Sequence, residues 1–379
     1  MTSELSSLCS YAKGKVSVDT LSKRNYVSTE NMMPNKGGIV DAGALPSAQY
    51  TQQYIKDDIL VSNIRPYFKK IWMADDDGGC SNDVLVFRAD RGCDSTFLYY
   101  ILANDAFFNY ASATSKGTKM PRGDKTAIMQ YKVPCFNYET QLRIGKLLRS
   151  IDDRIAVNKK INDNLQQQLF SLYENMATAS PCLKEYTLSN LCNFQEGYVN
   201  PPQTHPEYFD GEVKWLRAVD INESFIIETS RTLTKAGFES AKKSALLFEP
   251  NTIAISKSGT IGRLGIIADY MCGNRAVINI APHDTNMLAF IYCFLKSKQR
   301  EFPDIAVGSV QKNLYVSLLE PLSVSIPDNE SLTAFNAVGA SILGMIHNNC
   351  VENTDLANLR DTILPKLMSG EIDVSSVQL

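Results

Sequence analysis

Two short segments in the second half of the sequence carry side chains suited to binding a polyanion. Residues 256–263 (Ser-Lys-Ser-Gly-Thr-Ile-Gly-Arg) combine hydroxyls and two cations with turn-forming glycines, and residues 308–313 (Gly-Ser-Val-Gln-Lys-Asn) add amides to a lysine. Such groups contact phosphates, and Gln and Asn can bind an adenine edge through two hydrogen bonds. Residues 117–122 take the corresponding place in the first half. A solvated loop is the alternative for each segment alone, but the recurrence favours binding.

The charge distribution is compatible with nucleic-acid binding although the formal net charge is -3. Local clustering of cations matters more than net charge. Five cations between residues 116 and 132 face one acidic residue, Asp124. The side chains predicted to contact nucleic acid are cations, hydroxyls and amides: Arg65, Lys69, Lys116, Lys119, Arg122, Lys125, Lys257, Ser258, Arg263, Gln311, Lys312 and Asn313.

Patterns for catalysis or metal binding are weak. Residues 200–203 (Asn-Pro-Pro-Gln) resemble the motif of adenine-N6 methyltransferases, but Gln203 replaces the aromatic ring that would stack on a flipped base. The glycines at 259, 262 and 265 give GxxGxxG rather than the dinucleotide-binding GxGxxG, and a tight turn is the simpler interpretation. Residues 75–77 (Asp-Asp-Asp) are expected to form a solvated acidic loop. We therefore predict no catalytic residue, no metal site and no cofactor bound by this chain.

The elements that position the binding segments occur twice. Three short motifs return in the same order at an offset of roughly half the chain: 5–11 as 188–194, 58–62 as 252–256, and 80–82 as 272–274. Each copy then continues into a strand that ends at a proline and into a long helical pattern. The copies differ most in the binding segments and in residues 33–50 against 222–245, which suits two different targets.

The repeat predicts an α+β protein with two mixed α/β domains and two long helices. We divide the chain into a first domain (1–137), a central helix (138–180), a second domain (181–327) and a distal helix with a C-terminal tail (328–379). Within the domains, residues 59–64 and 253–255 are predicted strands, and 96–110 and 287–295 are predicted helices. The hydrophobic content of 44% is enough for two cores.

Cysteine usage and hydropathy predict a cytoplasmic protein. The nine cysteines are scattered without a CxxC pair, so neither disulfides nor a zinc site is indicated. Cys9 and Cys80 recur as Cys192 and Cys272, which indicates small buried residues in equivalent cores. The sequence lacks an apolar run of about 18 residues and a signal-peptide pattern, so we expect no membrane association.

Both long helices carry a heptad seam, because apolar or amide residues recur in steps of four and three. In the central helix they are Ile144, Leu148, Ile151, Ile155, Asn158, Asn162, Leu165, Leu169 and Leu172. In the distal helix they are Phe335, Gly339, Ile342, Ile346, Asn349, Asn353, Leu356, Arg360 and Ile363.

Asparagines at matching seam positions predict an antiparallel coiled coil in one register. Asn158 then faces Asn353 and Asn162 faces Asn349, while apolar residues face apolar residues on either side. A buried Asn is destabilising unless it meets a polar partner, so it fixes register. At about 1.5 Å per residue, such helices span about 60 Å and could set the distance between two DNA contacts. Two amphipathic helices that each pack on their own domain are the alternative.

These features together resemble the specificity (S, HsdS-type) subunit of type I restriction-modification systems. Residues 359–372 (Leu-Arg-Asp-Thr-Ile-Leu-Pro-Lys-Leu-Met-Ser-Gly-Glu-Ile) resemble the closing signature of that family, LRxxLLPKLLSGEI. Residues 308–313 resemble its GSxQKN-like segment. The first copy departs from the pattern, since Lys119, Met120 and Pro121 stand where a QKN-like run is expected.

The resemblance implies two target-recognition domains, each reading one half of a bipartite double-stranded DNA site, with the coiled coil setting the spacer. It also implies two modification (methyltransferase) subunits as partners, usually restriction (endonuclease and translocase) subunits, and S-adenosylmethionine bound by the methyltransferase subunits. This chain would then contribute specificity without catalysis. The alternative is a coiled-coil scaffold that binds other proteins rather than DNA.

Overall fold

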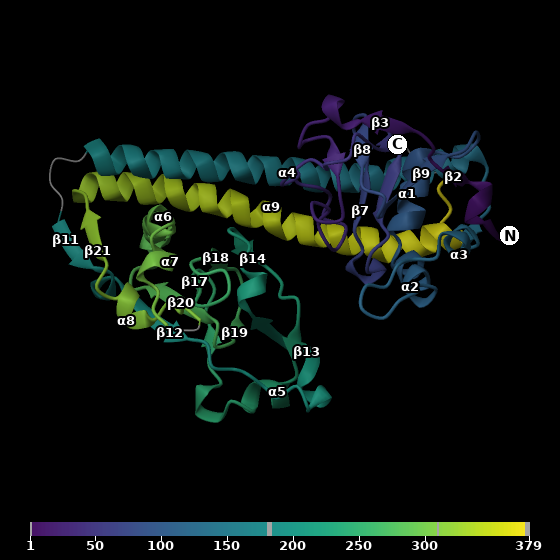
Figure 1. Cartoon of the computed structure of the whole chain (residues 1–379). Helices are drawn as coiled ribbons and strands as arrows, with labels where there is room; N and C mark the ends of the chain where they lie inside the picture. The colour runs from purple at the N-terminus through teal and green to yellow at the C-terminus, as the bar shows by residue number, and fades with distance from the viewer. Residues whose placement is uncertain (1, 180–183, 309–310, 376–379) are drawn as a thin grey trace. The chain divides into compact units, whose positions relative to one another are not determined.

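The computed structural model describes residues 2–179, 184–308 and 311–375. The chain forms two compact units. Unit 1 comprises Met1–Arg154 and Leu356–Leu379, and unit 2 comprises Ile155–Asp355. Helices α4 (Tyr138–Ala179) and α9 (Asn329–Ser369) each contribute one part to either unit (Figure 1). The boundary between the units falls between Arg154 and Ile155 in α4 and between Asp355 and Leu356 in α9.

The described residues of unit 1 form short strands, three short α-helices, three 3-10 helices and one end of each long helix. Its strands are β1 (Thr2–Glu4), β2 (Cys9–Tyr11), β3 (Lys15–Ser17), β4 (Tyr26–Val27), β5 (Tyr50–Tyr54), β6 (Ile59–Ser62), β7 (Ile71–Met73), β8 (Gly78–Cys80), β9 (Val84–Ala89) and β10 (Lys132–Pro134). Its short α-helices are α1 (Ser95–Ala103), α2 (Asp105–Ala113) and α3 (Lys125–Met129), and its 3-10 helices are η1 (Leu5–Ser7), η2 (Val18–Thr20) and η3 (Pro66–Phe68).

Two four-stranded sheets form the frame of unit 1, in the orders β2-β9-β6-β7 and β3-β5-β8-β4. Strand β6 is buried on both faces. Ile59 and Val61 pack into a core with α1, α2 and the long helices, whereas Leu60 packs toward the second sheet. This alternation follows from the two-residue period of a strand. Because both faces of β6 are packed, the strand is held in place and so is the start of the turn that follows it.

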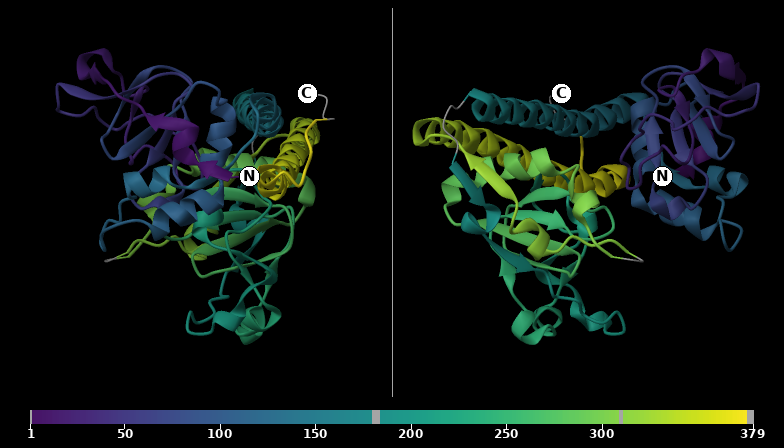
Figure 2. Two further views of the ribbon diagram at one scale, coloured as in Figure 1. Left: turned by 90° about the vertical axis from the view of Figure 1, so that its right-hand side faces the viewer. Right: turned by 60° about the vertical axis from the view of Figure 1, so that its left-hand side comes forward.

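Unit 2 repeats the plan (Figure 2), with a fifth strand added to its first sheet. Its strands are β11 (Lys184–Thr187), β12 (Cys192–Glu196), β13 (Phe209–Leu216), β14 (Phe225–Ile226), β15 (Thr232–Leu233), β16 (Leu247–Phe248), β17 (Ile253–Ser256), β18 (Leu264–Ile267), β19 (Met271–Gly273), β20 (Val277–Pro282) and β21 (Ser323–Ile326). Its short α-helices are α5 (Lys235–Glu239), α6 (Leu288–Lys298), α7 (Phe302–Ile305) and α8 (Val316–Leu319). Its 3-10 helices are η4 (Leu188–Asn190), η5 (Pro206–Tyr208), η6 (Ala218–Asp220), η7 (Lys242–Ser244) and η8 (Thr285–Met287).

The sheet orders confirm the internal repeat. The order β12-β20-β17-β18 in unit 2 matches β2-β9-β6-β7 in unit 1. The second sheets share a parallel pair, β4 with β8 and β13 with β19, but differ at their edges. There β3 pairs with β5, whereas β15 pairs with β13. Of these edge strands, β15 lies within residues 222–245, one of the regions in which the two copies diverge in sequence, whereas β3 lies outside residues 33–50.

Two details of the predicted helices are wrong. The single helix expected over 96–110 is two helices, because Asn104 ends α1 and its side chain accepts a hydrogen bond of 2.9 Å from the Ala106 amide to begin α2. Leu172 is 40% exposed and not a seam residue. Phe170, Tyr173 and Met176 pack on the unit 2 core beyond Leu169 instead. A straight helix of 3.6 residues per turn drifts away from a seven-residue repeat, so its buried face moves.

The paired cysteines occupy equivalent cores as predicted. Cys9, Cys80, Cys192 and Cys272 are at most 2% exposed. Burial raises the pKa of the thiols of Cys80, Cys192 and Cys272 to about 12. These cysteines therefore act as small apolar side chains.

Candidate nucleic-acid interface

In unit 1, two loops are joined through their backbones; we call them the unit 1 loop pair. The turn at 63–70 follows β6, and the hairpin at 116–122 is closed by hydrogen bonds of 2.9 Å in both directions between Lys116 and Arg122. The Gly123 amide donates to the Asn63 carbonyl over 3.1 Å, and the Arg65 amide donates to the Pro121 carbonyl over 2.8 Å. Side chains from two distant parts of the sequence thus share one surface.

Unit 2 holds an equivalent arrangement, the unit 2 loop pair. The turn at 257–263 joins β17 to β18, and the hairpin at 307–313 is closed by bonds of 3.0 and 2.9 Å between Val307 and Asn313. The Leu314 amide donates to the Lys257 carbonyl over 2.9 Å, which corresponds to the bond from Gly123 to Asn63. Ser309 and Val310 of the binding segment lie outside the described residues. The sequence prediction that both copies carry loops at equivalent places is confirmed.

The glycines of the unit 2 turn serve its geometry. Gly259 and Gly262 have φ values of 78° and 84°, which side chains disfavour. The Ser256 hydroxyl accepts a hydrogen bond of 2.8 Å from the Arg263 amide and donates to the Thr260 carbonyl, closing the turn. The GxxGxxG pattern is therefore a tight turn, as expected.

Several cations of the unit 1 loop pair are held by aspartates. Lys69 contacts Asp105 at 2.8 Å, Lys116 contacts Asp124 at 2.5 Å and Arg122 contacts Asp83 at 3.0 Å. The last two cations remain 82% and 56% exposed, so they can turn toward a phosphate. Within residues 2–179, 184–308 and 311–375, the side chains of Arg65, Lys119 and Lys125 have no polar partner. The unit 1 loop pair therefore presents both free and loosely paired cations.

Lys257 differs from the other predicted contacts, because its charge is used inside unit 2. It forms an ion pair of 2.9 Å with Glu196, and the two side chains are 13% and 19% exposed. Its ammonium also lies 4.7 Å from the centre of the Tyr315 ring. Partial burial of Glu196 opposes ionisation, but hydrogen bonds from Tyr198 and Lys257 lower the pKa of this carboxyl. Lys257 thus orders the turn, and a role in phosphate binding would require this pair to open.

The remaining predicted residues of unit 2 reach the surface. Gln311 and Lys312 are exposed. Three others are half-buried: Ser258, Arg263 and Asn313. The Lys312 ammonium donates to the Pro303 carbonyl over 3.3 Å, and the Asn313 amide donates to the Gln311 carbonyl over 3.0 Å. Lys312 and Gln311 are thus the side chains of this hairpin that are freest to bind.

Two surface residues of the unit 1 turn were not predicted from the sequence. Tyr67 and Phe68, in η3, are 53% and 40% exposed. The preceding Arg65 and the following Lys69 are both in the left-handed region, at φ 50° and 52°. Each such residue other than glycine costs about 1–2 kcal/mol. Residues 65–69 (Arg-Pro-Tyr-Phe-Lys) show no periodic pattern. The one sequence signal for a binding role is the presence of two adjacent aromatic rings between two cations.

The described residues hold no group of His, Cys, Asp or Glu that could ligate a metal ion. The acidic residues 75–77 lie in the loop between β7 and β8, and residues 200–203 lie in an irregular segment before η5. In the described chain, no helix is long and apolar enough to cross a membrane.

The asparagine pairs are present in the predicted antiparallel register. Asn158 donates to Asn353 over 3.0 Å, and Asn349 donates to Asn162 over 2.8 Å. Asn158 also donates to Glu352 over 2.9 Å. In the same region Leu169, Ile342 and Ile346 share the core of unit 2. Within unit 2 the helices are therefore coiled against each other as well as packed on the domain.

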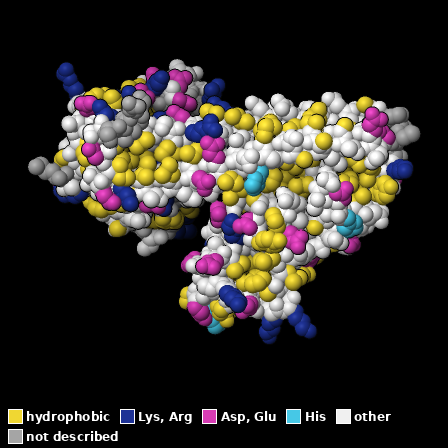
Figure 3. Space-filling view, turned by 180° about the vertical axis from the view of Figure 1, so that it is seen from behind, with side chains coloured by type: hydrophobic (Ala, Val, Ile, Leu, Met, Phe, Trp, Pro, Cys, Tyr) yellow, Lys and Arg dark blue, Asp and Glu magenta, His cyan; other side chains and the backbone are white. Residues whose placement is uncertain are grey.

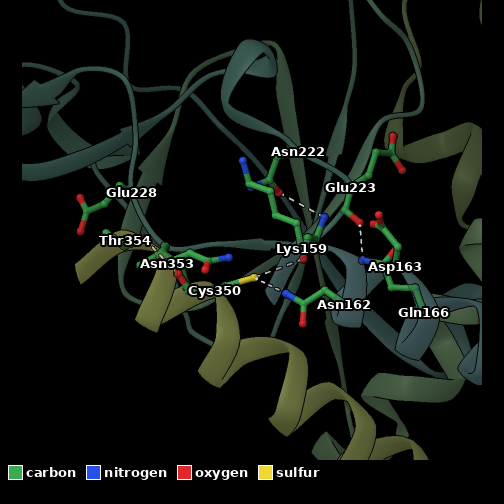
Figure 4. A pocket seen from close by; sticks show the side chains of 12 residues that line it. Lys159, Asn162, Asp163, Gln166, Asn222, Glu223, Glu228, Cys350, Asn353 and Thr354 are labelled. Carbon is green, nitrogen blue, oxygen red and sulfur yellow. Dashed lines mark hydrogen bonds between the residues drawn. The ribbon is translucent and has the colours of Figure 1, made fainter. Parts of the chain in front are cut away.

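A polar pocket of about 490 Å³ lies beside this seam (Figure 4). Helix α4 supplies Asn162, α9 supplies Cys350, and the segment before β14 supplies Glu223. Asn162 lies 3.5 Å from the Cys350 sulfur, and Gln166 donates to the Glu223 carbonyl over 3.1 Å. Along the wall of this pocket, these hydrogen bonds link α4 to α9 and to the segment before β14, all within unit 2.

Comparison with known proteins gives consistent matches. The family model for the type I restriction modification DNA specificity domain matches residues 1–167 and 183–354. The MjaIX type I restriction enzyme specificity subunit of Methanocaldococcus jannaschii is 24% identical over 309 residues, which cover 76% of this chain and 71% of that protein. The HindI type I restriction enzyme specificity subunit of Haemophilus influenzae is 27% identical over 176 residues, 45% of this chain and 38% of that protein.

A solved structure shares the fold. The crystal structure of the type I restriction-modification S subunit from M. genitalium superposes with a TM-score of 0.57 at 19% identity. The match covers 97% of this chain and 96% of that chain. At this identity the likeness shows the architecture rather than the target.

Proposed function

Because the chain belongs to the type I restriction modification DNA specificity family, we propose that it is the subunit that gives a restriction-modification complex its DNA sequence specificity. One observation of the structure carries this proposal furthest. Both units hold a loop pair joined by the same backbone hydrogen bond, from Gly123 to Asn63 and from Leu314 to Lys257. A protein that recognises a bipartite DNA site requires two equivalent surfaces with different side chains.

Each loop pair reads one half of a double-stranded DNA site. Exposed cations such as Lys119 and Lys312 position the duplex through its phosphates, and affinity falls as salt rises. Amide and apolar side chains contact base edges and supply specificity. The candidate contacts of unit 1 are mainly cations and rings, whereas those of unit 2 include Gln311 and Asn313. The two half-sites therefore differ in sequence.

The long helices set the spacer between the half-sites. Helices α4 and α9 are continuous over 42 and 41 residues, and each belongs in part to both units. The pairs Asn158–Asn353 and Asn162–Asn349 oppose sliding of one helix along the other, because a shifted register would bury unpaired amides. A fixed register gives a fixed spacer.

The partners are two methyltransferase subunits, which bind S-adenosylmethionine, and restriction subunits in a complete system. This chain carries out no catalysis itself, and it acts in the cytoplasm together with its DNA. Seven large apolar side chains of the long helices are at least 40% exposed: Tyr138, Val157, Ile161, Leu172, Val338, Met345 and Leu359. Hydrophobic side chains reach the surface along the helices of unit 2 in the space-filling view (Figure 3). Such positions suit docking of partner subunits.

Sequencing of methylated DNA from cells with and without the gene tests this function. We expect one bipartite motif to lose methylation when the gene is deleted. A Gln311→Ala variant should relax one half of that motif and leave the other half unchanged. Lys184→Ala, which removes an exposed cation on β11, is the control and should leave both halves unchanged. A scaffold that binds only proteins would leave the methylation pattern intact on deletion.

A further inference from the structure

The aromatic tip of the unit 1 turn is held in an unfavourable backbone conformation. We call Tyr67 and Phe68 the aromatic tip. Arg65 and Lys69, on either side, both adopt left-handed backbone angles. Two further residues that grip the turn, Asn35 and Lys36, have φ values of 54° and 62°. Strain of this kind persists only where surrounding contacts over-determine it, and it concentrates at functional sites.

The contacts that over-determine the turn come from several directions. The amides of Asn35 and Lys36 donate to the carbonyls of Phe68 and Lys69, each over 2.8 Å. Asp105, at the start of α2, binds the ammonium groups of Lys36 and Lys69 at 2.9 and 2.8 Å. Partial burial of Asp105 would raise its pKa, but hydrogen bonds from both lysines lower it, so the carboxylate stays charged. The backbone of the tip is therefore fixed before any ligand arrives.

The rings themselves are left in solvent by this arrangement. Tyr67 and Phe68 are 53% and 40% exposed, and their ring centres lie 4.8 Å apart at an angle of 55°. Neither ring belongs to the hydrophobic clusters that form the core of unit 1. A fixed backbone that presents two apolar rings to water indicates a surface that another molecule covers.

The surroundings of the aromatic tip point to duplex DNA as that molecule. The Arg65 amide bonds to Pro121, which brings the tip beside the hairpin that carries Lys116, Lys119 and Arg122. In proteins that bend DNA, cations bind the phosphates while apolar side chains between them insert into a base step and unstack it. The matching turn of unit 2 has serine, threonine and glycine at 258–260 and lacks aromatic residues.

We propose that Tyr67 and Phe68 act as a wedge that enters the duplex in the half-site read by unit 1 and unstacks one base step. The wedge makes the two half-sites unequal, since only one of them is distorted in this way. Pyrimidine–purine steps unstack most easily, so such a step is the expected target. This inference rests on the proposed function and deepens it.

Fluorescence of 2-aminopurine, which rises on unstacking, tests the wedge. The probe is the duplex bearing the methylated motif, with 2-aminopurine placed at successive positions in both half-sites, and the protein is the full chain with its methyltransferase subunits. We expect a rise at one step in one half-site, besides the target adenines that methyltransferases extrude. The paired variant Tyr67→Ala with Phe68→Ala should abolish that rise and weaken binding about 10-fold to 100-fold. Tyr67→Phe should retain both.

The control is Tyr270→Ala, which removes an equally exposed ring, at 54% exposure, from the turn between β18 and β19. It should change neither signal, and circular dichroism should show that every variant is folded. Undiminished fluorescence and affinity in the paired variant would overturn the wedge and leave the proposed function standing. Normal DNA binding with loss of a partner subunit on gel filtration would also overturn it, since the rings would then bind protein. No specific binding by the native complex would refute the proposed function itself.

Discussion

The Asn162–Asn349 pair offers a direct measurement of what holds the helices in register. Asn162 is 6% exposed, and its side-chain oxygen accepts a 2.8 Å hydrogen bond from Asn349. The change Asn162→Leu removes that acceptor and leaves the Asn349 amide against a hydrocarbon side chain. A buried amide without a partner costs about 1–3 kcal/mol, and because Asn349 is only half-buried we expect the lower part of that range. For a unit of this size we expect the melting temperature to fall by about 2–8 °C.

The complementary double variant separates pairing from simple polarity. With Asn162→Leu and Asn349→Leu together, apolar meets apolar at this seam position, so we expect stability to return to the native level or above it. Thermal unfolding of the four proteins gives the coupling energy of the pair. Asn164→Leu, on the exposed face of α4, is the control and should change stability by less than about 0.5 kcal/mol. If the double variant were as destabilised as the sum of the single variants, the pairing argument would be refuted.

Three further outcomes are expected. Deleting 155–158 from α4 and 353–356 from α9 shortens each helix by about 6 Å and turns its end by about 40°. Methylome sequencing should then show a spacer that is shorter by about one or two base pairs. An unchanged spacer would contradict the proposal that the long helices set the spacer length. Lys312→Ala should weaken binding to DNA and lower the slope of log affinity against log salt by about one, and an unaltered gel-shift titration would exclude a phosphate contact. The raised pKa of the Cys80 and Cys272 thiols, about 12, favours their neutral form in the folded state. Unfolded thiols ionise near pH 8.5, so stability should fall in chemical denaturation as pH rises from about 8.5 to 12, and less so in Cys→Ala variants.

Periodic features of this chain could be predicted from its sequence. The strands β6 and β17 and the long helices follow from local periodicity, and the asparagine register follows from polar positions that match between the two helices. The internal repeat also allowed the equivalent loop positions to be predicted. The same motifs precede the loops in both copies, and equal motifs imply the same order of strands in the sheet.

Features that depend on one tertiary contact could not be predicted in this way. Glu196 precedes Lys257 by 61 residues in the sequence, so no local pattern reveals that it pairs with this lysine. The drift of the buried face from Leu172 to Tyr173 depends on rings of α6, since Tyr173 packs 5.5 Å from Phe290. The break between α1 and α2 had a readable signal, because Asn104 followed by Asp105 is a typical helix start.

The bonds that join each loop pair have a consequence for how specificity can change. The links from Gly123 to Asn63 and from Leu314 to Lys257 use main-chain atoms only, so they survive replacement of most neighbouring side chains. Substitutions at Lys119 or Gln311 can therefore accumulate without disturbing the frame. Under the proposed function, point mutations at these positions would change the recognised sequence while the sheets and the main-chain links stay the same.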